Sequence, residues 1–369
     1  MEKDPALRAP KRDFRAAGLR RATQALLPLL LAGCTPLSPY YDPAKPHHTA
    51  TGFRNNYLHG EIGGSFLKWQ WERRTQGLPP PPAHGFPGPV DRPDEAWLKA
   101  NRTQTAATWI GHATVLMQVN GVNLLFDPIF SERASPVSFA GPKRKIPPAL
   151  SAAQLPHIDV VMISHNHYDH LDRASVLALN GQAKGPPLFL VPLGLKSWMQ
   201  DQGIDNVREL DWWEQVSVPG LDLTLVPVQH WSARGLTDRF KTLWGGWTAV
   251  TAAGAAQPFS LFFGGDTGYS KDFIDIGKRF KGFDLALLPI GAYEPRWFMQ
   301  AQHINPAEAV KIHRDINARV SVGIHWGSFE MTDEALDEPP KALARAREQA
   351  GLPPERFIVP RHGQTLLFR

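Results

Sequence analysis

The chain of 369 residues contains a single cysteine, Cys34. An intrachain disulfide needs two cysteines, so none can form in any compartment. A lone cysteine also excludes the metal sites that are built from several thiolates. Any metal held by this chain must therefore be bound by nitrogen and oxygen ligands.

Apolar runs long enough to cross a bilayer are also lacking. The run "ALLPLLLAG" (25–33) is far shorter than the roughly 20 residues that a spanning helix needs. It follows a basic stretch and ends in small residues, which is the anatomy of a secretory signal. The sequence "LAGC" resembles a bacterial lipobox. We therefore expect residues 1–33 to be a signal peptide and Cys34 to be lipidated. The alternatives are an uncleaved N-terminal anchor and a disordered basic tail.

A strong charge excess is missing from the body of the chain. The net charge is +5, but residues 1–33 hold seven basic and three acidic side chains and so account for +4 of it. The remainder carries only +1, which gives no reason to expect a nucleic-acid partner.

Proline is plentiful after the leader. Residues 34–50, "TPLSPYYDPAKPHHTA" after Cys34, are proline-rich and show no periodicity, which predicts a tether. His47 and His48 lie in this segment; we expect them to be solvated and not to bind metal. The remaining residues, 51–369, are predicted to form one domain.

Strand-like and helical patterns alternate from about residue 106. Asn120-Gly121 lies between two apolar runs and predicts a hairpin turn. The continuous apolar run "IDVVMIS" (158–164) is typical of a strand covered on both faces. "RASVLALN" then predicts a helix with Asp172 as its N-cap. Further strands are expected at 221–228, 259–265, 283–291 and 320–326, and further helices at 306–316 and 339–351. The pattern predicts an α/β protein.

Five of the predicted strands are followed directly by an imidazole or a carboxylate. Open α/β sheets commonly build their sites at this edge. Buried polar groups without partners would be costly there, so a common ligand explains them together. The five residues are Asp127, His165, His230, Asp266 and His325.

The segment "HNHYDH" (165–170) places three of the 14 histidines and one aspartate in six positions. His165 and His167 can point the same way on an extended backbone. Asp169 and His170 can face a second position on the following turn. Imidazole and carboxylate suit zinc, and four clustered ligands exceed what one open zinc site needs. The motif therefore favours two metal ions over a solvated histidine-rich turn.

The motif has the form His-x-His-x-Asp-His and resembles that of the metallo-β-lactamase superfamily. This resemblance implies an αββα sandwich, in which two mixed β-sheets are covered by helices and a dinuclear metal site lies at the sheet edge. The chain further resembles the N-acylphosphatidylethanolamine-hydrolysing phospholipase D family. The similar stretches include "GHATVLMQVNGVNLLFDPIFSERASP", "GPKR", "ISHNHYDHLD", "QHW", "FFGGDTGYS", "IGAYEPRWFMQAQHINPAEAV" and "IHWG".

The family resemblance implies a role for each candidate residue. One zinc ion would be held by His165, His167 and His230, and a second by Asp169, His170 and His325. Asp266 would bridge the two ions. Asp127 would orient a ligand, or would simply be a turn residue before Pro128.

Four other residues are weaker candidates for a role in catalysis or substrate binding. His303 is expected to donate the leaving-group proton or to contact the phosphate, with Gln302 beside it; the alternative is a packed histidine at a helix entry. Tyr168 is a candidate substrate contact. His112 either lies near the site or is structural. The tryptophans, among them Trp212-Trp213 and Trp297, either mark a membrane-facing surface or fill the core.

The expected activity is that of a zinc-dependent phosphodiesterase. It would use a hydroxide shared by the metals to hydrolyse N-acylphosphatidylethanolamine, or a related phospholipid, to phosphatidate and N-acylethanolamine. Its partners would be the phospholipid, a membrane on the periplasmic side of the bacterial envelope, and a second copy in a homodimer. The alternatives are a metallo-hydrolase of a lactone, a soluble phosphodiester or a β-lactam, and a non-catalytic envelope lipoprotein with a vestigial metal site.

Overall fold

The computed structural model describes residues 37–57, 66–83, 85, 90–255 and 257–368. Residues 37–369 form one compact unit. The predicted signal peptide and Cys34 lie outside the described residues, so both stay predictions.

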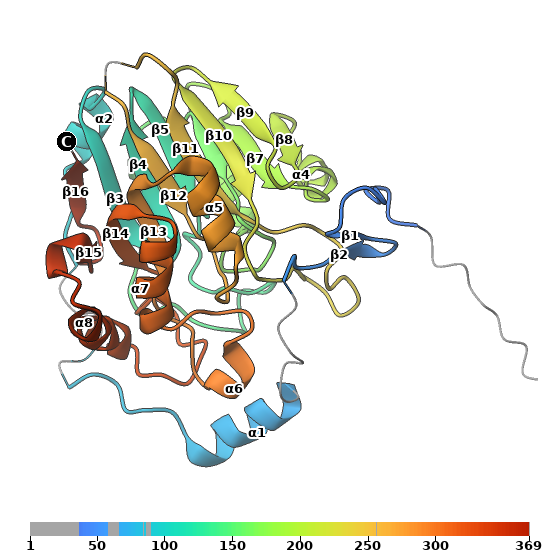
Figure 1. Ribbon diagram of the computed structural model, residues 1–369, viewed down its shortest axis with the longest axis vertical. Coiled ribbons are helices and arrows are strands. Elements are labelled where there is room, and N and C mark those ends of the chain that lie inside the picture. The colour runs from blue at the N-terminus through green and yellow to red at the C-terminus, as the bar shows by residue number, and fades with distance from the viewer. Residues whose placement is uncertain (1–36, 58–65, 84, 86–89, 256, 369) are drawn as a thin grey trace, which may run out of the picture. The chain divides into compact units, whose positions relative to one another are not determined.

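Two seven-stranded mixed sheets form the centre of the molecule (Figure 1). The first sheet has the order β16 (Thr365–Phe368), β3 (Thr105–Gly111), β4 (Thr114–Val119), β5 (Val122–Phe126), β6 (Val160–Met162), β7 (Leu188–Pro192) and β8 (Val207–Leu210). The second has the order β15 (Phe357–Ile358), β14 (Ala318–Ile324), β13 (Phe283–Pro289), β12 (Ser260–Phe263), β11 (Gly246–Thr251), β10 (Leu221–Val226) and β9 (Gln215–Val218). A small hairpin joins β1 (His48–Thr49) and β2 (Gly52–Phe53).

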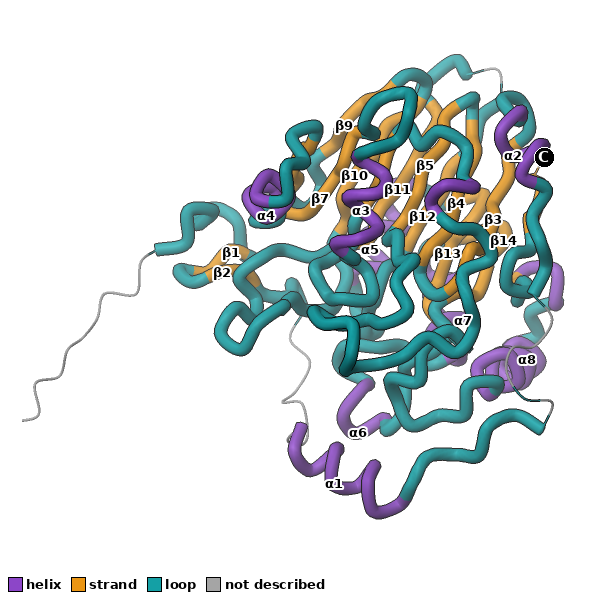
Figure 2. The backbone as a smooth tube through the Cα atoms, turned by 180° about the vertical axis from the view of Figure 1, so that it is seen from behind, coloured by secondary structure: helices purple, strands orange, loops and turns teal. Residues whose placement is uncertain are grey.

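Helices cover the outer faces of both sheets, as Figures 1 and 2 show from opposite sides. The helices are α1 (Phe66–Gln76), α2 (Glu95–Ala100), α3 (Arg173–Asn180), α4 (Lys196–Asp201), α5 (Asp272–Phe280), α6 (Arg296–Met299), α7 (Pro306–Asp315) and α8 (Glu338–Ala350), with short 3-10 turns at Ala152–Gln154 and Pro354–Arg356. The predicted αββα sandwich is confirmed. No helix in the described part of the chain combines the length and apolar character that a bilayer crossing requires.

Local sequence signals explain where these elements begin and end. Asn120 and Gly121 both have positive φ, 51° and 80°, and pair Val119 with Val122 across a two-residue turn. This is the backbone that Asn-Gly favours. The Asp172 side chain accepts a hydrogen bond from the Ser175 N–H and caps α3, as predicted.

Alternating side chains divide the apolar residues between two layers. In β4, Val115 and Met117 join the core between the sheets, whereas Leu116 faces the other side. This is the two-residue period of a strand buried on both faces. Phe126 at the end of β5 stacks on Phe263 at the end of β12, with ring centroids 4.6 Å apart. The two sheets are therefore packed together next to the edge where Asp127 and Asp266 follow.

The segment predicted as a solvated tether packs against the domain from residue 37 onward. His47 and His48 are buried, and both donate to Asp211 from Nε2 at 2.6 and 2.9 Å. Lys45 also donates to this carboxylate, and His47 stacks on Trp212. The tether prediction is therefore wrong for residues 37–50. The sequence did not indicate this packing, because the partner of the two histidines lies more than 160 positions away along the chain.

Two of the tryptophan predictions are decided by this packing. Trp212 is buried and donates from Nε1 to the Trp244 carbonyl. It therefore fills the core, and Trp213 is only partly exposed. The membrane-facing interpretation is wrong for Trp212 and stays a prediction for Trp213.

We expect Asp211→Ala to release the N-terminal segment and to lower the free energy of unfolding by roughly 2 kcal/mol, because it removes several hydrogen bonds to one buried carboxylate. Burial alone would raise the pKa of Asp211, but hydrogen bonds from His47 and Lys45 lower it well below the ordinary 3.8. The stabilisation is therefore complete above that value and is lost as the pH falls below it.

Denaturant titrations at pH 7 and pH 3, together with limited proteolysis of residues 37–57, measure both effects. Asp205→Ala is the matched control, because Asp205 is exposed and its side chain forms no hydrogen bond or ion pair within the described part of the chain. Equal protease sensitivity in the two variants would show that Asp211 does not hold the segment.

Candidate metal centre

All seven predicted metal ligands converge at one edge of the sandwich. Four come from the turn between β6 and α3, and the others follow β10, β12 and β14. All of them are buried except His167, which is partly exposed. The seven residues are His165, His167, Asp169, His170, His230, Asp266 and His325.

Three imidazole nitrogens form the first group of candidate ligand atoms. His167 Nδ1 lies 2.8 Å from His165 Nε2 and 3.3 Å from His230 Nε2. The three rings meet nearly at right angles, so each directs one nitrogen at a common point.

Two imidazoles and two carboxylates form the second group. His170 Nε2 lies 3.2 Å from His325 Nε2. Asp266 faces both rings, with Oδ2 3.1 Å from His170 Nε2 and Oδ1 3.1 Å from His325 Nε2. Asp169 Oδ2 lies 3.3 Å from His170 Nε2. Asp266 also clusters with His165 of the first group, so its carboxylate stands between the two groups.

In three of these rings the nitrogen that points away from the centre has a hydrogen-bond partner, and this partner shows which nitrogen carries the proton. His230 Nδ1 lies 2.9 Å from the Gln302 carbonyl, which can only accept. His165 Nδ1 lies 2.9 Å from Ser164 Oγ, whose own proton goes to Asp127. His170 Nδ1 faces Asp127 Oδ2 at 2.7 Å. With their protons on the outward side, the neutral rings of His165 and His230 point lone pairs inward, and burial keeps the pKa of both rings well below 6.5. His170 directs its Nδ1 proton at Asp127.

This arrangement fits divalent cations. Inward lone pairs repel one another unless something positive lies between them. Ligands about 2.0 Å from a tetrahedral zinc ion would be roughly 3.3 Å apart, close to the spacings seen here. Burial alone would lower the pKa of His170, but Asp266, Asp169 and Asp127 raise it well above 6.5. The excess negative charge calls for a bound cation, and an all-nitrogen-and-oxygen donor set suits zinc and its neighbours.

Asp127 holds the centre in place from behind. It accepts from the Ser164 N–H at 2.7 Å, from the Ser164 hydroxyl at 2.6 Å and from His170. Burial raises the pKa of Asp127, while His170 and Ser164 oppose that rise. Its φ of 38° is unfavourable for a non-glycine residue, and His325 has a φ of 62°. Such strain persists only where the surroundings hold it, and it gathers at functional sites.

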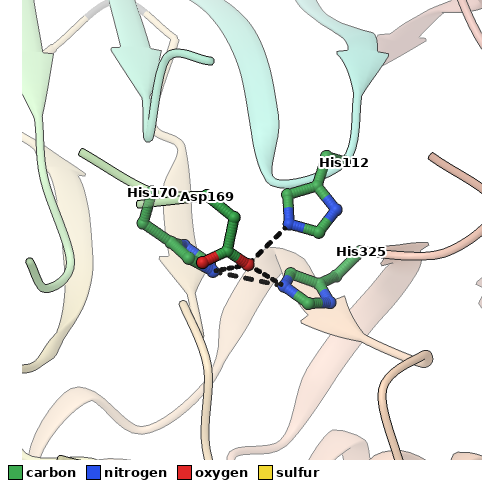
Figure 3. Close-up of side chains that lie close together, drawn as sticks. All are labelled: His112, Asp169, His170 and His325. Carbon is green, nitrogen blue, oxygen red and sulfur yellow. Dashed lines mark hydrogen bonds and ion pairs between the residues drawn. The ribbon is translucent and has the colours of Figure 1, made fainter. Parts of the chain in front are cut away.

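His112 belongs to the centre, which decides the question that the sequence left open. Figure 3 shows the Asp169 carboxylate between His112, His170 and His325. His112 donates from Nε2 to Asp169 Oδ2 at 2.9 Å, and its ring lies over His325 with centroids 3.9 Å apart. Burial, then His325, lowers the pKa of His112 to about 3, so the ring is neutral. It therefore positions Asp169 as a hydrogen-bond donor.

His303 lies at the rim of the same cluster. Its Nδ1 is 3.8 Å from Asp266 Oδ2, and its ring centroid is 5.3 Å from that of His230. Burial lowers its pKa to about 4. His303 is therefore a partly exposed, neutral imidazole at the rim of the candidate metal centre.

Gln302 and Tyr168 have contacts that the sequence did not predict. The Gln302 side chain donates to the Met299 sulfur, and the residue meets the centre through its carbonyl, which orients His230. The Tyr168 hydroxyl donates to the Arg234 carbonyl, and the Arg234 guanidinium covers the Tyr168 ring at 4.0 Å. Both contacts are structural, so a substrate role for either side chain stays a prediction.

Sequence reasoning missed several residues that shape the centre. Arg234 donates to the Asn166 and Leu171 carbonyls and so clamps the turn that carries the ligands. Trp231 packs edge-on against His167. Asn55 donates to the His230 carbonyl and accepts from the His230 N–H. Only Trp231 could have been found from the sequence, because it adjoins the predicted ligand His230. Arg234 and Asn55 could not, because the residues that they contact lie far away along the chain.

Gly265 shows why glycine precedes Asp266. It has a φ of +57°, and a Cβ there would lie 2.7 Å from the Ser164 Cβ. Glycine is the residue that tolerates both the backbone conformation and the close approach. The segment "GGDTGYS" thus lets the backbone before Asp266 pass close to Ser164.

A third group of potential ligands, His47, His48 and Asp211, does not fit a metal. The Lys45 ammonium already neutralises the Asp211 carboxylate, and both histidines donate to it. The Lys45 ammonium would repel a cation added there. This cluster therefore holds the N-terminal segment on the domain and is not a metal site.

We expect Asp127→Asn to weaken metal binding about 10–100-fold, as loss of a ligand-orienting partner commonly does. An amide offers one acceptor oxygen where the carboxylate accepts three hydrogen bonds, so it cannot hold both Ser164 and His170. Chelator competition with zinc measures the affinity. Asp222→Asn, on β10 and remote from the centre, is the matched control. Wild-type affinity in the Asp127 variant would mean that His170 is oriented by something else.

Comparisons with known proteins agree with this geometry. Residues 122–326 match the model of the beta-lactamase superfamily domain, and this span contains all seven candidate ligands. An N-acyl-phosphatidylethanolamine-hydrolyzing phospholipase D of Caenorhabditis elegans is 47% identical over 259 residues, which cover 66% of this chain and 70% of the relative. A mitochondrial protein of the same description from Saccharomyces cerevisiae is 40% identical, over 71% of this chain and 55% of the relative.

Solved structures share the fold at lower sequence identity. An isothiocyanate hydrolase from Delia radicum gut bacteria has a TM-score of 0.57 at 20% identity, over 71% of this chain and 98% of that one. Igni18, a metallo hydrolase from Ignicoccus hospitalis, has a TM-score of 0.53 at 20% identity, over 72% and 99% of the two chains. The chain belongs to the metallo-β-lactamase superfamily of metal-dependent hydrolases, in the family of the N-acyl-phosphatidylethanolamine-hydrolysing phospholipase D proteins.

Proposed function

We propose that this protein is a zinc-dependent phospholipase D that hydrolyses N-acylphosphatidylethanolamine, or a related phospholipid, to phosphatidate and an N-acylethanolamine. The observation that carries the proposal is the 47% identity to the Caenorhabditis elegans phospholipase D over 259 residues, in a chain whose whole ligand set converges. A vestigial site would be expected to have lost ligands, and here none of the seven is missing.

Two zinc ions would be held at the centre. His165, His167 and His230 would bind one ion, and Asp169, His170 and His325 would bind the other, because these groups present their inward atoms to separate points. Asp266 would contact both ions, because its carboxylate clusters with His165 of the first group and also faces His170 and His325 of the second.

The reaction adds water across the bond between phosphorus and the N-acylethanolamine oxygen. Bound zinc would supply a nucleophile at neutral pH by lowering the pKa of water, and would neutralise charge that builds up on the phosphate. The chain's own residues hold the geometry: Asp127 and His112 fix His170 and Asp169, and Arg234 clamps the ligand turn. The leaving alkoxide must take up a proton.

We assign assistance of the departing group to His303. It lies beside Asp266 and His230 at the partly exposed rim. With a pKa near 4 it is neutral, so it can donate an N–H hydrogen bond to a phosphate oxygen or to the leaving oxygen. Arg296 holds the loop in place by donating to the His303 carbonyl at 2.9 Å.

A small cavity of mixed polarity adjoins the centre. His112, His325, Trp326, Phe329 and Met331 line it together with the carboxylates of Glu330 and Glu334.

The experiment that tests the function uses purified, zinc-loaded protein and N-acylphosphatidylethanolamine in detergent micelles. We expect phosphatidate and N-acylethanolamine in equal amounts, because one phosphodiester bond is cut. Diacylglycerol as the lipid product would mean that the other phosphoester bond is cleaved. Turnover of lactones, soluble phosphodiesters or β-lactams alone would contradict the proposal.

Three variants complete this assay. His167→Ala should abolish turnover and lower metal content, because it removes a ligand. His303→Ala should slow turnover about 100-fold with metal retained, which is in the range for loss of a proton-transfer or hydrogen-bonding partner. His157→Ala, far from the centre and partly exposed, should match the wild type. Equal metal loss in the His167 and His303 variants would mean that His303 is a ligand.

We also propose that the protein is a lipoprotein anchored by Cys34 on the periplasmic side of a bacterial membrane. The signal anatomy of residues 1–33 and the lipobox-like "LAGC" support this location, which would place the enzyme beside its substrate. Homodimer formation stays a prediction from the family resemblance.

We expect Cys34→Ser to move the protein from the membrane to the soluble fraction of the expressing bacterium, because the acceptor of the lipid is removed. A protein made without residues 1–33 serves as the soluble control. Unchanged membrane fractionation of the Cys34 variant, after a high-salt wash, would contradict lipidation.

A further inference from the structure

The side chain of Asn55 pairs with the backbone of the candidate ligand His230. Its Nδ2 donates to the His230 carbonyl at 3.0 Å, and its Oδ1 accepts from the His230 N–H at 3.1 Å. Within the described part of the chain, neither of these two backbone groups has another hydrogen bond. Buried backbone groups need partners, so one asparagine supplies what a neighbouring strand would otherwise supply.

His230 depends on this pairing because it lies outside the sheet. Strand β10 ends at Val226, so no strand ladder fixes the backbone four residues later. The imidazole itself is oriented through Nδ1, which lies 2.9 Å from the Gln302 carbonyl. The ligand therefore has two supports of different kinds: Gln302 sets the orientation of the ring, and Asn55 sets the position of the backbone that carries it.

Asn55 in turn is held in place by the docking of residues 37–57 on the domain. Phe53 is buried in the core, and its N–H donates to the Phe240 carbonyl at 2.9 Å. The Arg54 N–H donates to the His47 carbonyl at 2.9 Å, which ties the chain next to Asn55 to the histidine pair on Asp211. The β1–β2 hairpin that makes these contacts lies outside both large sheets (Figure 1).

A continuous set of contacts joins the Asp211 cluster to Asn55. Trp212 stacks on His47, with ring centroids 4.4 Å apart, and donates from Nε1 to the Trp244 carbonyl at 2.6 Å. Trp244 donates from its own Nε1 to Asn55 Oδ1 at 3.2 Å. Both tryptophans are buried. Packed side chains and hydrogen bonds of this kind can carry a change at one end to the other.

We propose that Asn55 is a positioning residue for one metal ion and that docking of residues 37–57 is coupled to occupation of the ligand group His165, His167 and His230. When the segment is docked, the His230 backbone is fixed within reach of the other two imidazoles. When it is undocked, metal binding must order that backbone by itself. Coupling between two events is reciprocal, so an ion bound to this group also holds the segment on the domain.

The second ligand group should be nearly insensitive to the segment. Among the described residues, none of those at 37–57 has a hydrogen bond to Asp169, His170 or His325. The proposal takes its two ions from the proposed function, whereas the contacts of Asn55 do not depend on which substrate is cleaved. Selectivity for one ion is therefore the signature that separates positioning by Asn55 from a general contribution to folding.

The first test removes zinc from the full chain by competition with a chelator. We expect Asn55→Ala to weaken the binding of one ion about 10–100-fold, the range for loss of a group that orients a ligand, and to affect the other ion much less. In the His167→Ala background, where the first group already lacks a ligand, Asn55→Ala should have no further effect. With cobalt(II) in place of zinc, the visible absorption of one ion alone should change in the Asn55 variant.

Asn206→Ala is the matched control. The Asn206 side chain also donates to a backbone carbonyl, that of Pro187, at 2.9 Å. It precedes β8, whereas the ligands follow the ends of strands; because β6, β7 and β8 are parallel, it lies at the opposite edge of the first sheet. Its zinc affinities should equal those of the wild type.

The second test measures the reciprocal effect by limited proteolysis. Zinc should slow cleavage within residues 37–57 of the wild type, and this protection should be lost in Asn55→Ala and in His167→Ala, which lacks a ligand of the first group. Asp211→Ala, which releases the segment, should weaken the same ion as Asn55→Ala. The double variant should then be little worse than either single variant, because the segment is already undocked.

Four outcomes would overturn the coupling. Equal weakening of both ions in Asn55→Ala, with a lowered melting temperature, would make Asn55 a general structural residue. Unchanged affinity for both ions would show that Gln302 alone positions His230. Cleavage of residues 37–57 at a rate independent of zinc would exclude the reciprocal effect. Additive losses in the double variant would mean that Asp211 and Asn55 act separately.

Failure of the proposed function is a distinct result. A zinc-loaded wild type that does not turn over any phospholipid would refute that function, while selective weakening of one ion by Asn55→Ala would still support the coupling.

Discussion

The convergence of inward-facing lone pairs and carboxylates at one sheet edge is the constraint on which the rest of the structure depends. Three of the imidazoles are held from behind by an acceptor: Ser164 Oγ for His165, Asp127 for His170 and the Gln302 carbonyl for His230. That arrangement fixes the tautomer and leaves mutually repelling groups around two points. The fold supplies the energy to hold them together, and bound cations would relieve the repulsion. The strained φ angles of His112, Asp127 and His325 gather at the same place, as expected where packing overrides local preference.

The two packed sheets give this centre its rigidity. The Phe126–Phe263 stack and the hydrogen bond from Trp247 to the Ile163 carbonyl join the sheets directly behind the ligands. The ligands therefore stand on strand ends whose positions are set by an extended apolar core. The N-terminal segment adds to this support, because Asp211 fixes its start and Asn55 holds the backbone of His230. A region that looks like a linker is thus part of the scaffold of the metal centre.

The sequence by itself determined the local elements and the donor set. The apolar runs, the Asn-Gly turn and the cap at Asp172 act over a few residues, so they can be recognised without a structure. The spacing of "HNHYDH" and the polar residues after strands indicated the metal chemistry for the same reason. Only the tertiary structure decided that His112 serves the centre, that residues 37–50 pack on Asp211 and that Gln302 acts through its carbonyl. Those contacts join positions far apart in the chain, and no local pattern records a partner that folding alone brings near.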